Sequence, residues 1–286
     1  RWDALYFPWN SAAIAYHALS ELAIPVIVSC RGSQVNVRPH TPGNEAFMHE
    51  LRASLQQAAA VHCVSADILQ EATKYGLDPA RASVIRPAVD PGFFLPPTSP
   101  PASSRLVIIT TGALTWLKGH EYDLLALRQL LDLGVEAEFH IIGAGPERQR
   151  VLYTIQDLAL EGRVILHGKL PSAEVRDQLQ AADVFLLASH SEGIANAALE
   201  AMSCGLPVVT TDCGGMREAV TDGVEGFVVP ARDPAAMADA LLRLAQDPAL
   251  RLRMGQAARA RVLRDFDLKD QIIAFTELMT AAQAGS

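Results

Sequence analysis

The stretch "DVFLLASHSEGIANAALEAMSCGLPVVTT", residues 183–211, holds two short apolar runs separated by an alanine-rich segment. In the runs "DVFLLAS" and "PVVTT" the apolar residues are consecutive rather than alternating. Continuous apolar strands are typical of a parallel sheet covered on both faces, because both sides of each strand are then buried. A helix expected at residues 195–204 would join the two runs. This strand–helix–strand unit predicts an α/β fold.

The same alternation extends along most of the chain. Before residue 95 the expected strands are "ALYF", "IPVIVSC", "VHCVS" and "ASVIRPAV", and after residue 104 they are "RLVIITTG", "AEFHIIG", "RVILHG", "DVFLLAS", "PVVTT" and "GFVVP". Helical segments separate most of them, and "RGSQVNVRPHTPG", residues 31–43, predicts a polar loop. Parallel strands joined by right-handed crossovers give Rossmann-like, doubly wound sheets.

Proline and serine cluster in "PPTSPPASS", residues 96–104. Consecutive proline-containing steps cannot continue a helix or a central strand, so this segment predicts a domain linker. The expected domains are therefore an N-terminal one at residues 1–95 and a C-terminal one at residues 105–264, followed by a terminal helical segment at residues 265–286. A partner domain usually matches its neighbour in size, so the shorter first domain is expected to be incomplete.

Composition limits the classes of protein to consider. Half of the 286 residues are apolar, the formal net charge is −8, and no run of Lys or Arg suggests nucleic-acid binding. The four cysteines form no CxxC pair, which favours a reduced, cytoplasmic protein. No apolar run has membrane-spanning length, and no residues have metal-ligand spacing. We therefore expect neither a metal nor a separate cofactor.

In a doubly wound sheet, ligands bind beyond the carboxyl ends of the strands. Gly112 ends one strand and would let a ligand approach the backbone. Lys118 follows in the same loop and could contact a phosphate, although the position by itself favours a surface lysine flanking a helix. Gly145, in "IIGAGPE", and Gly168, in "HGKLPSAEV", occupy the next two loops. A glycine in such a loop often serves only to allow a tight turn.

The loop after "DVFLLAS" carries Glu192, and the helix that follows carries Glu200, one turn after Asn196 on the same face. The first amides of that helix, at about residues 194–197, would form an anion site. Glu192 would repel a phosphate there, so it must face a neutral group rich in hydroxyls. A carboxylate that accepts from vicinal hydroxyls holds ribose in such sheets, which is the role expected of Glu200. The alternative, that both are solvated surface residues, fits poorly with a helix that is apolar nearly all round.

Together these residues give the chain a recognisable pattern. The segment "SEGIANAALEAMSCGLPVVTTDCGGMREAVTDGVEGFVVPARD", with "GALTWLKG" and "IIGAGPE" before it, resembles the C-terminal domain of the glycosyltransferase group 1 family, retaining enzymes of the GT-B fold. The resemblance is close over residues 105–264 and weaker in "SCRGSQV" and the segments that follow it. It implies an α/β GT-B fold with two Rossmann-like domains.

The resemblance also implies roles for individual residues. Glu192 would contact hydroxyls of the donor sugar, and Glu200 would bind the ribose. Lys118, with the backbone at residues 194–196, would hold the diphosphate, and the backbone around Gly168–Leu170 would face the base. The terminal helix would cross back to the N-terminal domain. The remaining substrate-binding residues implied are Gly112, Gly145, Gly168 and Leu170, Gly193, Ile194, Ala195 and Asn196, and Arg31.

Two positions depart from the family pattern. Ala113 stands where many members have a second cation, and Arg217 is a speculative substitute for it. Arg31 stands where many members have a histidine. The expected function is transfer of a hexose from a nucleotide-diphosphate sugar to an acceptor hydroxyl of a glycan, lipid or small molecule, with retention and without a metal. A non-catalytic nucleotide-sugar-binding subunit or an inactive fragment is the alternative, and peripheral contact with a membrane stays open.

Overall fold

The computed structural model describes residues 3–16, 24–98 and 105–284. The chain divides into two compact units. Unit 1 contains residues 1–87, 191–194 and 268–286, and unit 2 contains residues 88–190 and 195–267. Most of the predicted linker, residues 99–104, lies outside the described residues.

The sheet of unit 2 has six parallel strands in the order β10-β9-β8-β5-β6-β7. Their bounds are β5 Leu106–Thr111, β6 Ala137–Ile142, β7 Val164–Gly168, β8 Val184–Leu187, β9 Val208–Thr211 and β10 Gly226–Val229. From β5 the chain builds outward to β6 and β7, then returns to the other side of β5 with β8. The strand order therefore reverses between β5 and β8, and such a reversal opens a crevice beyond the strand ends where ligands bind.

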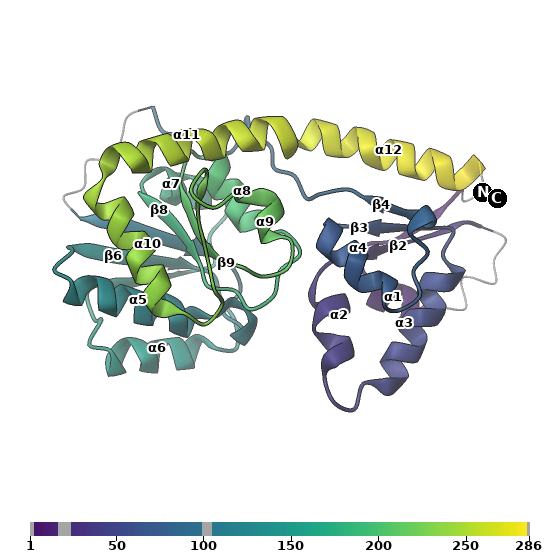
Figure 1. Cartoon of the computed structure of the whole chain (residues 1–286), viewed down its shortest axis with the longest axis horizontal. Coiled ribbons are helices and arrows are strands. Elements are labelled where there is room, and N and C mark those ends of the chain that lie inside the picture. Colours follow the sequence, from purple (N-terminus) through teal and green to yellow (C-terminus); the bar gives the residue numbers. More distant parts are fainter. Residues whose placement is uncertain (1–2, 17–23, 99–104, 285–286) are drawn as a thin grey trace. The chain divides into compact units, whose positions relative to one another are not determined.

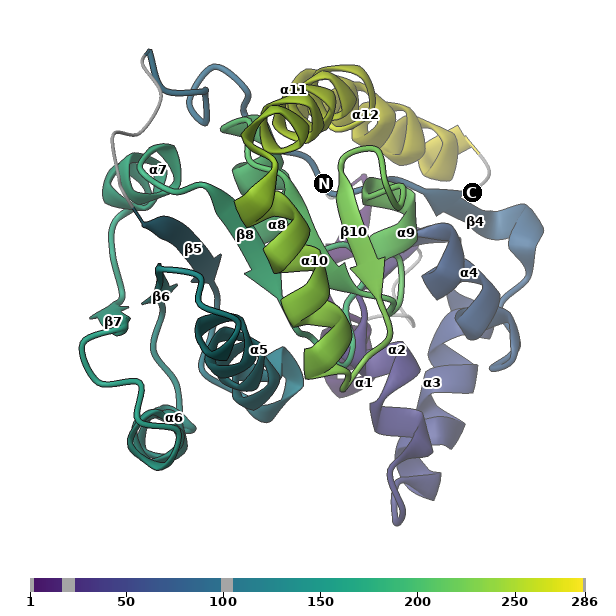
Figure 2. The same ribbon diagram turned by 60° about the vertical axis from the view of Figure 1, so that its left-hand side comes forward.

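Helices cover both faces of this sheet (Figures 1 and 2). On one face lie α5 His120–Asp132, α6 Arg148–Asp157 and α10 Pro234–Gln246, and on the other lie α7 Ser172–Gln180, α8 Asn196–Ser203 and α11 Pro248–Asp265. The short α9, Met216–Ala219, follows β9. Because both faces are covered, the strands can be apolar throughout, and the burial of every residue in β5, β8 and β9 agrees with this.

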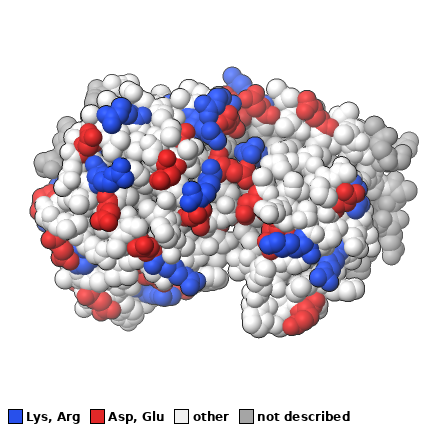
Figure 3. Space-filling view, viewed as in Figure 1, with Lys and Arg blue, Asp and Glu red and all other residues white. Residues whose placement is uncertain are grey.

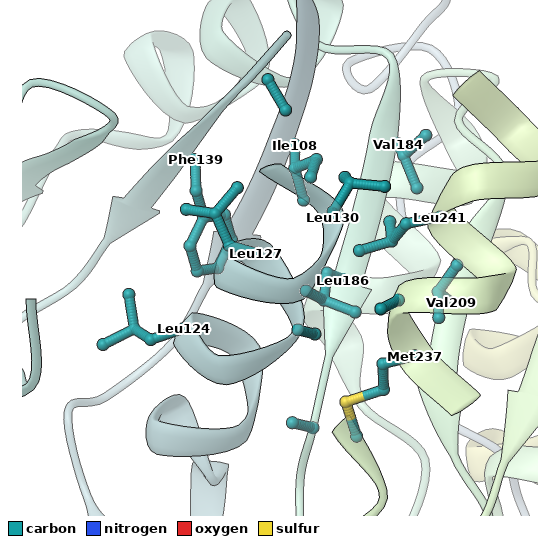
Figure 4. Close-up of a cluster of buried hydrophobic side chains, with 14 of the residues drawn as sticks. Ile108, Leu124, Leu127, Leu130, Phe139, Val184, Leu186, Val209, Met237 and Leu241 are labelled. Carbon is teal, nitrogen blue, oxygen red and sulfur yellow. The ribbon is translucent and has the colours of Figure 1, made fainter. Parts of the chain in front are cut away.

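The main core of unit 2 lies between the sheet and the helices α5 and α10. Figure 4 shows side chains from both helices interleaved with side chains from the strands. Leu127 and Leu241 are fully buried, as are Phe139 and Val209 on the sheet. This packing fixes the amino ends of the helices relative to the strand ends, and so it positions the loops between them.

Unit 1 has a four-stranded parallel sheet in the order β1-β2-β3-β4, with bounds Leu5–Phe7, Val26–Cys30, Ala60–Cys63 and Ala82–Val84. The order runs in one direction, and α1 Asn10–Ala15, α2 Ser33–Asn36, α3 Glu45–Gln57 and α4 Ala66–Thr73 pack against one face. The terminal helix α12, Leu268–Ala284, covers the other face, where Leu278 and Ala282 meet Ile27, Ala60 and Ile85. The last helix of the chain is thus part of the core of the first unit.

One predicted loop was wrong in part. Residues 31–43 were expected to form a polar loop, but they contain α2 and a 3₁₀ turn at Arg38–His40. A four-residue helix is too short to show a hydrophobic period, so the pattern could not reveal it. The first helix of unit 1, α1, ends at Ala15, and residues 17–23 lie outside the described part of the chain.

On the face drawn in Figure 3, acidic and basic side chains of the described residues are interspersed, and neither sign gathers into a broad patch. This agrees with the absence of a basic run in the sequence.

Candidate active site

A cavity of about 350 Å³ opens in unit 2 where β5, β6 and β7 end. Residues from the loops after these strands line it together with residues from α7 and α8: Thr111, Gly112, Ala113, Ile142, Gly143, Ala144, Lys169, Leu170, Ser172, Val175 and Glu200, with Phe94 beside them. Three of the predicted binding residues, Gly112, Leu170 and Glu200, therefore share one cavity.

Glycines bring the loops after β5 and β6 into direct backbone contact. A Cβ on Gly143 would lie 1.7 Å from the carbonyl oxygen of Gly112, and a Cβ on Gly145 would lie 2.3 Å from that of Leu114. No side chain fits in either position. Gly145 thus allows the two loops to pack closely and does not itself line the cavity. The loop after β7 joins them, because the carbonyl oxygen of Gly168 accepts a hydrogen bond at 2.8 Å from the N–H of Gly143.

Lys118 ends a 3₁₀ turn, Trp116–Lys118, that leads into α5. Its side chain lies over Gly112: a Cβ built there would be 3.4 Å from Cε and 3.9 Å from Nζ of Lys118. The ammonium is therefore next to a residue that lines the cavity. A cation in this position is suited to a phosphate at the cavity's edge.

Glu200 projects from α8 into the cavity wall. Burial raises the pKa of its carboxyl group to about 7. The carboxylate form is thus costly until hydroxyl donors reach it, and a ribose could supply two such donors.

The amino end of α8 lies at the end of the loop that follows β8. Ala195 occupies the N-cap position, and its own N–H donates to the sulfur of Met216 at 3.4 Å. Because the amide of Ala195 is engaged, the first-turn amides available to a ligand are those of Asn196 and Ala197. The anion site predicted at residues 194–197 therefore has fewer backbone donors than expected.

Glu192, Gly193 and Ile194 belong to unit 1, together with Arg31. Within that unit the carbonyl oxygen of Glu192 accepts a hydrogen bond from Asn36 Nδ2 at 3.4 Å. A Cβ on Gly193 would strike the side chain of Val64 at 2.6 Å. The lining of the cavity in unit 2 does not include Glu192.

Arg31 directly follows β2 and is anchored within unit 1. Its Nε donates to Ser29 Oγ at 3.0 Å, and its Nη2 donates to the hydroxyl of Tyr6 at 3.2 Å. Ser29 Oγ also lies 2.8 Å from Nδ1 of the buried His62. Burial, together with the nearby Arg31 cation, lowers the pKa of His62 to about 4, so His62 is neutral at physiological pH and adds no positive charge beside Arg31.

The sequence missed one cation. Lys169, between Gly168 and Leu170, lines the same cavity as Glu200. Its loop was identified for its backbone alone, and only the meeting of β5, β6 and β7 brings the lysine to the site. Arg217, in contrast, already makes two hydrogen bonds with Asp212, at 2.7 and 2.8 Å, which leaves it poorly suited to replace the cation missing at Ala113.

Neither a metal site nor a membrane-spanning helix occurs among the described residues. No three His, Cys, Asp or Glu side chains come together in a way that could bind a metal ion. No described helix is long and apolar enough to cross a membrane.

Two parallel-sheet α/β units, one with a cavity at the carboxyl ends of its strands beside the point where the strand order reverses, define the GT-B class of protein. The profile of the family described as glycosyl transferases group 1 matches residues 94–261, and that of glycosyltransferase family 4 matches residues 4–93. The chain belongs to the glycosyl transferases group 1 family.

Two curated relatives are about one-third identical to the chain. The D-inositol 3-phosphate glycosyltransferase of Acidothermus cellulolyticus is 34% identical over 208 residues, which cover 66% of this chain and 46% of the relative. The amylovoran biosynthesis glycosyltransferase AmsK of Erwinia amylovora is 34% identical over 209 residues, covering 71% of this chain and 51% of the relative. The chain thus spans about half the length of these relatives.

Solved structures agree on the fold. Sucrose-phosphate synthase from Thermosynechococcus elongatus has a TM-score of 0.89 at 21% identity, covering 100% of this chain and 75% of that one. Anabaena HepE, solved in complex with UDP, has a TM-score of 0.86 at 20% identity, covering 98% of this chain and 79% of that one.

Proposed function

We propose that this protein transfers a hexose from a nucleotide-diphosphate sugar to an acceptor hydroxyl, with retention of anomeric configuration. The observation that carries the proposal is the cavity of unit 2, which combines a carboxylate on α8, a lysine over the strand-end Gly112 and a wall of loop residues. Family membership and the UDP-bound state of HepE support a nucleotide donor.

The proposed donor complex gives these groups the roles that the family resemblance implies. Glu200 accepts from the ribose hydroxyls, and backbone of residues 168–170 faces the base. The diphosphate lies between Lys118 and the first-turn amides of α8, while Glu192 accepts from hydroxyls of the sugar. Lys169 adds positive charge to the same cavity.

Cleavage of the bond between sugar and phosphate leaves negative charge on the diphosphate. Preorganised donors aimed at developing charge are commonly the largest catalytic contribution, and Lys118 with the α8 amides has that role in the proposal. The proposal requires no metal, and it includes a cytoplasmic location, which four buried cysteines that form no disulfide support.

A second function is favoured by Ala113. Because this wall position carries no cation, the cavity could hold a nucleotide sugar without activating it, as in a non-catalytic binding subunit. Turnover separates the two functions.

The first test is a thermal-shift panel of UDP-, GDP- and ADP-sugars, with Glu200→Ala as the control. We expect one donor to raise the melting temperature of the wild type and to have a smaller effect on the variant. NMR of the product from the selected donor then reports the anomeric configuration, and the reaction is expected to continue in EDTA. An inverted product would contradict retention, and activity restored only by Mg²⁺ or Mn²⁺ would contradict metal independence.

A further inference from the structure

The first turn of α5 buries two titratable side chains, His120 and Asp123. They are 4% and 1% exposed, and Nδ1 of His120 lies 3.2 Å from Oδ2 of Asp123. Residues three apart share one face of a helix, so both side chains point into the core together with Leu124 and Leu127.

Packing alone does not explain this pair. Nε2 of His120 and Oδ1 of Asp123 are both buried and lack a hydrogen-bond partner among the described residues. Burial raises the pKa of Asp123 above its usual value, which measures the cost of keeping this carboxylate out of water. Apolar side chains of similar size commonly fill such a place without loss of stability. A role outside stability is therefore the better explanation.

The pair lies at the reversal of strand order between β5 and β8. The turn just before it joins the end of β8 in two ways. The carbonyl oxygen of Leu117 accepts a hydrogen bond from the N–H of His190 at 2.8 Å. Gly119 lies so close to β8 that a Cβ on it would be 2.2 Å from the carbonyl oxygen of Ala188.

Asp123 adds a further interaction between α5 and the segment that follows β8. The backbone amide of Ala188 favours the charged form of this carboxylate, as does His120. The backbone N–H of Asp123 also bonds to the carbonyl oxygen of Gly119 at 3.4 Å. The carboxylate thus lies between His120 on α5 and the backbone just after β8, whereas the tie to the turn that carries Lys118 is made by the backbone of Asp123.

We propose that His120 and Asp123 are positioning residues that fix the Lys118–Gly119 turn to the end of β8 and so hold the Lys118 ammonium in place for the leaving diphosphate. This inference rests on the proposed function. It assigns a role to two side chains that do not line the cavity.

The test uses an apolar double variant, His120→Phe with Asp123→Leu. We expect it to fold with a melting temperature equal to or above that of the wild type, because an isolated buried pair is replaced by core-like side chains. We expect kcat to fall by about tenfold to a hundredfold, the scale of a small misplacement of a catalytic group, with little change in KM. Asp123→Asn, which retains a hydrogen-bond acceptor, should recover much of that loss.

A matched control lies on the same helix. Arg128 and Asp132 form an exposed pair four residues apart, with Nη2 donating to Oδ1 at 2.6 Å. Replacing this pair by Met and Leu should leave kcat unchanged.

A double-mutant cycle with Lys118→Ala tests whether the pair affects activity through Lys118. If the pair acts through Lys118, the apolar double variant costs no further activity in the Lys118→Ala background. Full additivity would overturn the inference, as would a lower melting temperature with unchanged kcat per folded molecule.

Binding gives a readout that does not need turnover. The probe is whichever of UDP, GDP and ADP the thermal-shift panel selects, with the matching nucleoside as reference. We expect the apolar variant to reduce the affinity gained from the diphosphate and to leave nucleoside affinity unchanged. An unchanged gain would overturn the inference, whereas a wild type that binds none of the three would overturn the proposed function instead.

Discussion

Among the residues described as lining the cavity, Glu200 has a carboxyl group whose pKa burial shifts into the physiological range. Its pKa is raised from 4.5 to about 7, so the folded protein holds a proton that the unfolded chain has lost. The contribution of Glu200 to the free energy of unfolding therefore falls as pH rises between about 4.5 and 7, and this contribution is constant above that range. At neutral pH the site is poised between a neutral acid and a carboxylate ready for hydroxyl donors.

We predict that Glu200→Gln raises the free energy of unfolding, and by about 2 kcal/mol more at pH 8 than at pH 5, because the amide removes a charge that is costly to bury. Urea unfolding at the two pH values measures the difference. For binding the sign is opposite: a nucleotide sugar should bind the wild type more tightly at pH 8 than at pH 6, and the variant should lose that dependence. An unchanged pH dependence in the variant would assign it to another group.

The second prediction for a single residue concerns Lys118. Charge on the leaving diphosphate is larger in the transition state than in the bound donor, so a cation aimed at it acts more on turnover than on binding. We predict that Lys118→Ala lowers kcat by about a hundredfold, with a smaller change in KM. Lys74→Ala, at an exposed lysine of unit 1, is the control in the same steady-state assay. Near-wild-type kcat in Lys118→Ala would shift the role to Lys169.

The positions at or beside the cavity that could be predicted from sequence are those whose surroundings are local. Gly112, Lys118 and Glu200 each stand at a strand end or on a helix face that the hydrophobic pattern defines. Lys169 and the His120–Asp123 pair could not be found in this way. Their surroundings come from strands that are distant in sequence, and a histidine and an aspartate at the start of a helix have the same pattern as a solvated first turn.

Among the elements, the ten strands of the described residues were predicted because each includes a short apolar run. The signal is clearest in β5, β8 and β9, which are apolar or Thr throughout and fully buried. The α2 turn was missed because four residues show no period. The connection between β5 and α5 shows how elements, rather than single residues, set the site. Its Gly119 is in the left-handed region with φ of 63° and contacts β8 through backbone.

We predict that Gly119→Ala lowers the free energy of unfolding by roughly 3 kcal/mol or more, since it adds left-handed strain of about 1–2 kcal/mol to a direct overlap with Ala188. Gly134→Ala is the matched control, because Gly134 ends the same helix with φ of 83° and has open space around its Cα. It should cost only the strain, about 1–2 kcal/mol. Equal losses in urea unfolding would mean that the turn can move away from β8.

At the scale of the whole molecule, the described residues form hydrophobic clusters that each lie within a single unit. The core of unit 2 is closed by α5 and α10, whereas unit 1 needs the last helix of the chain, α12, to cover the second face of its sheet. The two units should therefore respond independently to changes in their cores, since cores without shared partners behave additively.

We predict that Leu278→Ala destabilises unit 1 alone. Leu278 is 6% exposed and packs on Ile27, Ala60 and Ile85, so the substitution should cost about 2–3 kcal/mol. Hydrogen exchange should speed up in β1 to β4, while protection in β5 to β10 and the affinity for the nucleoside diphosphate stay the same. Ile273→Ala, at a 57% exposed position of the same helix, should change neither. Loss of protection in both sheets would show instead that the chain unfolds as one cooperative body, and α12 would then contribute to the stability of the nucleotide site as well as to that of unit 1.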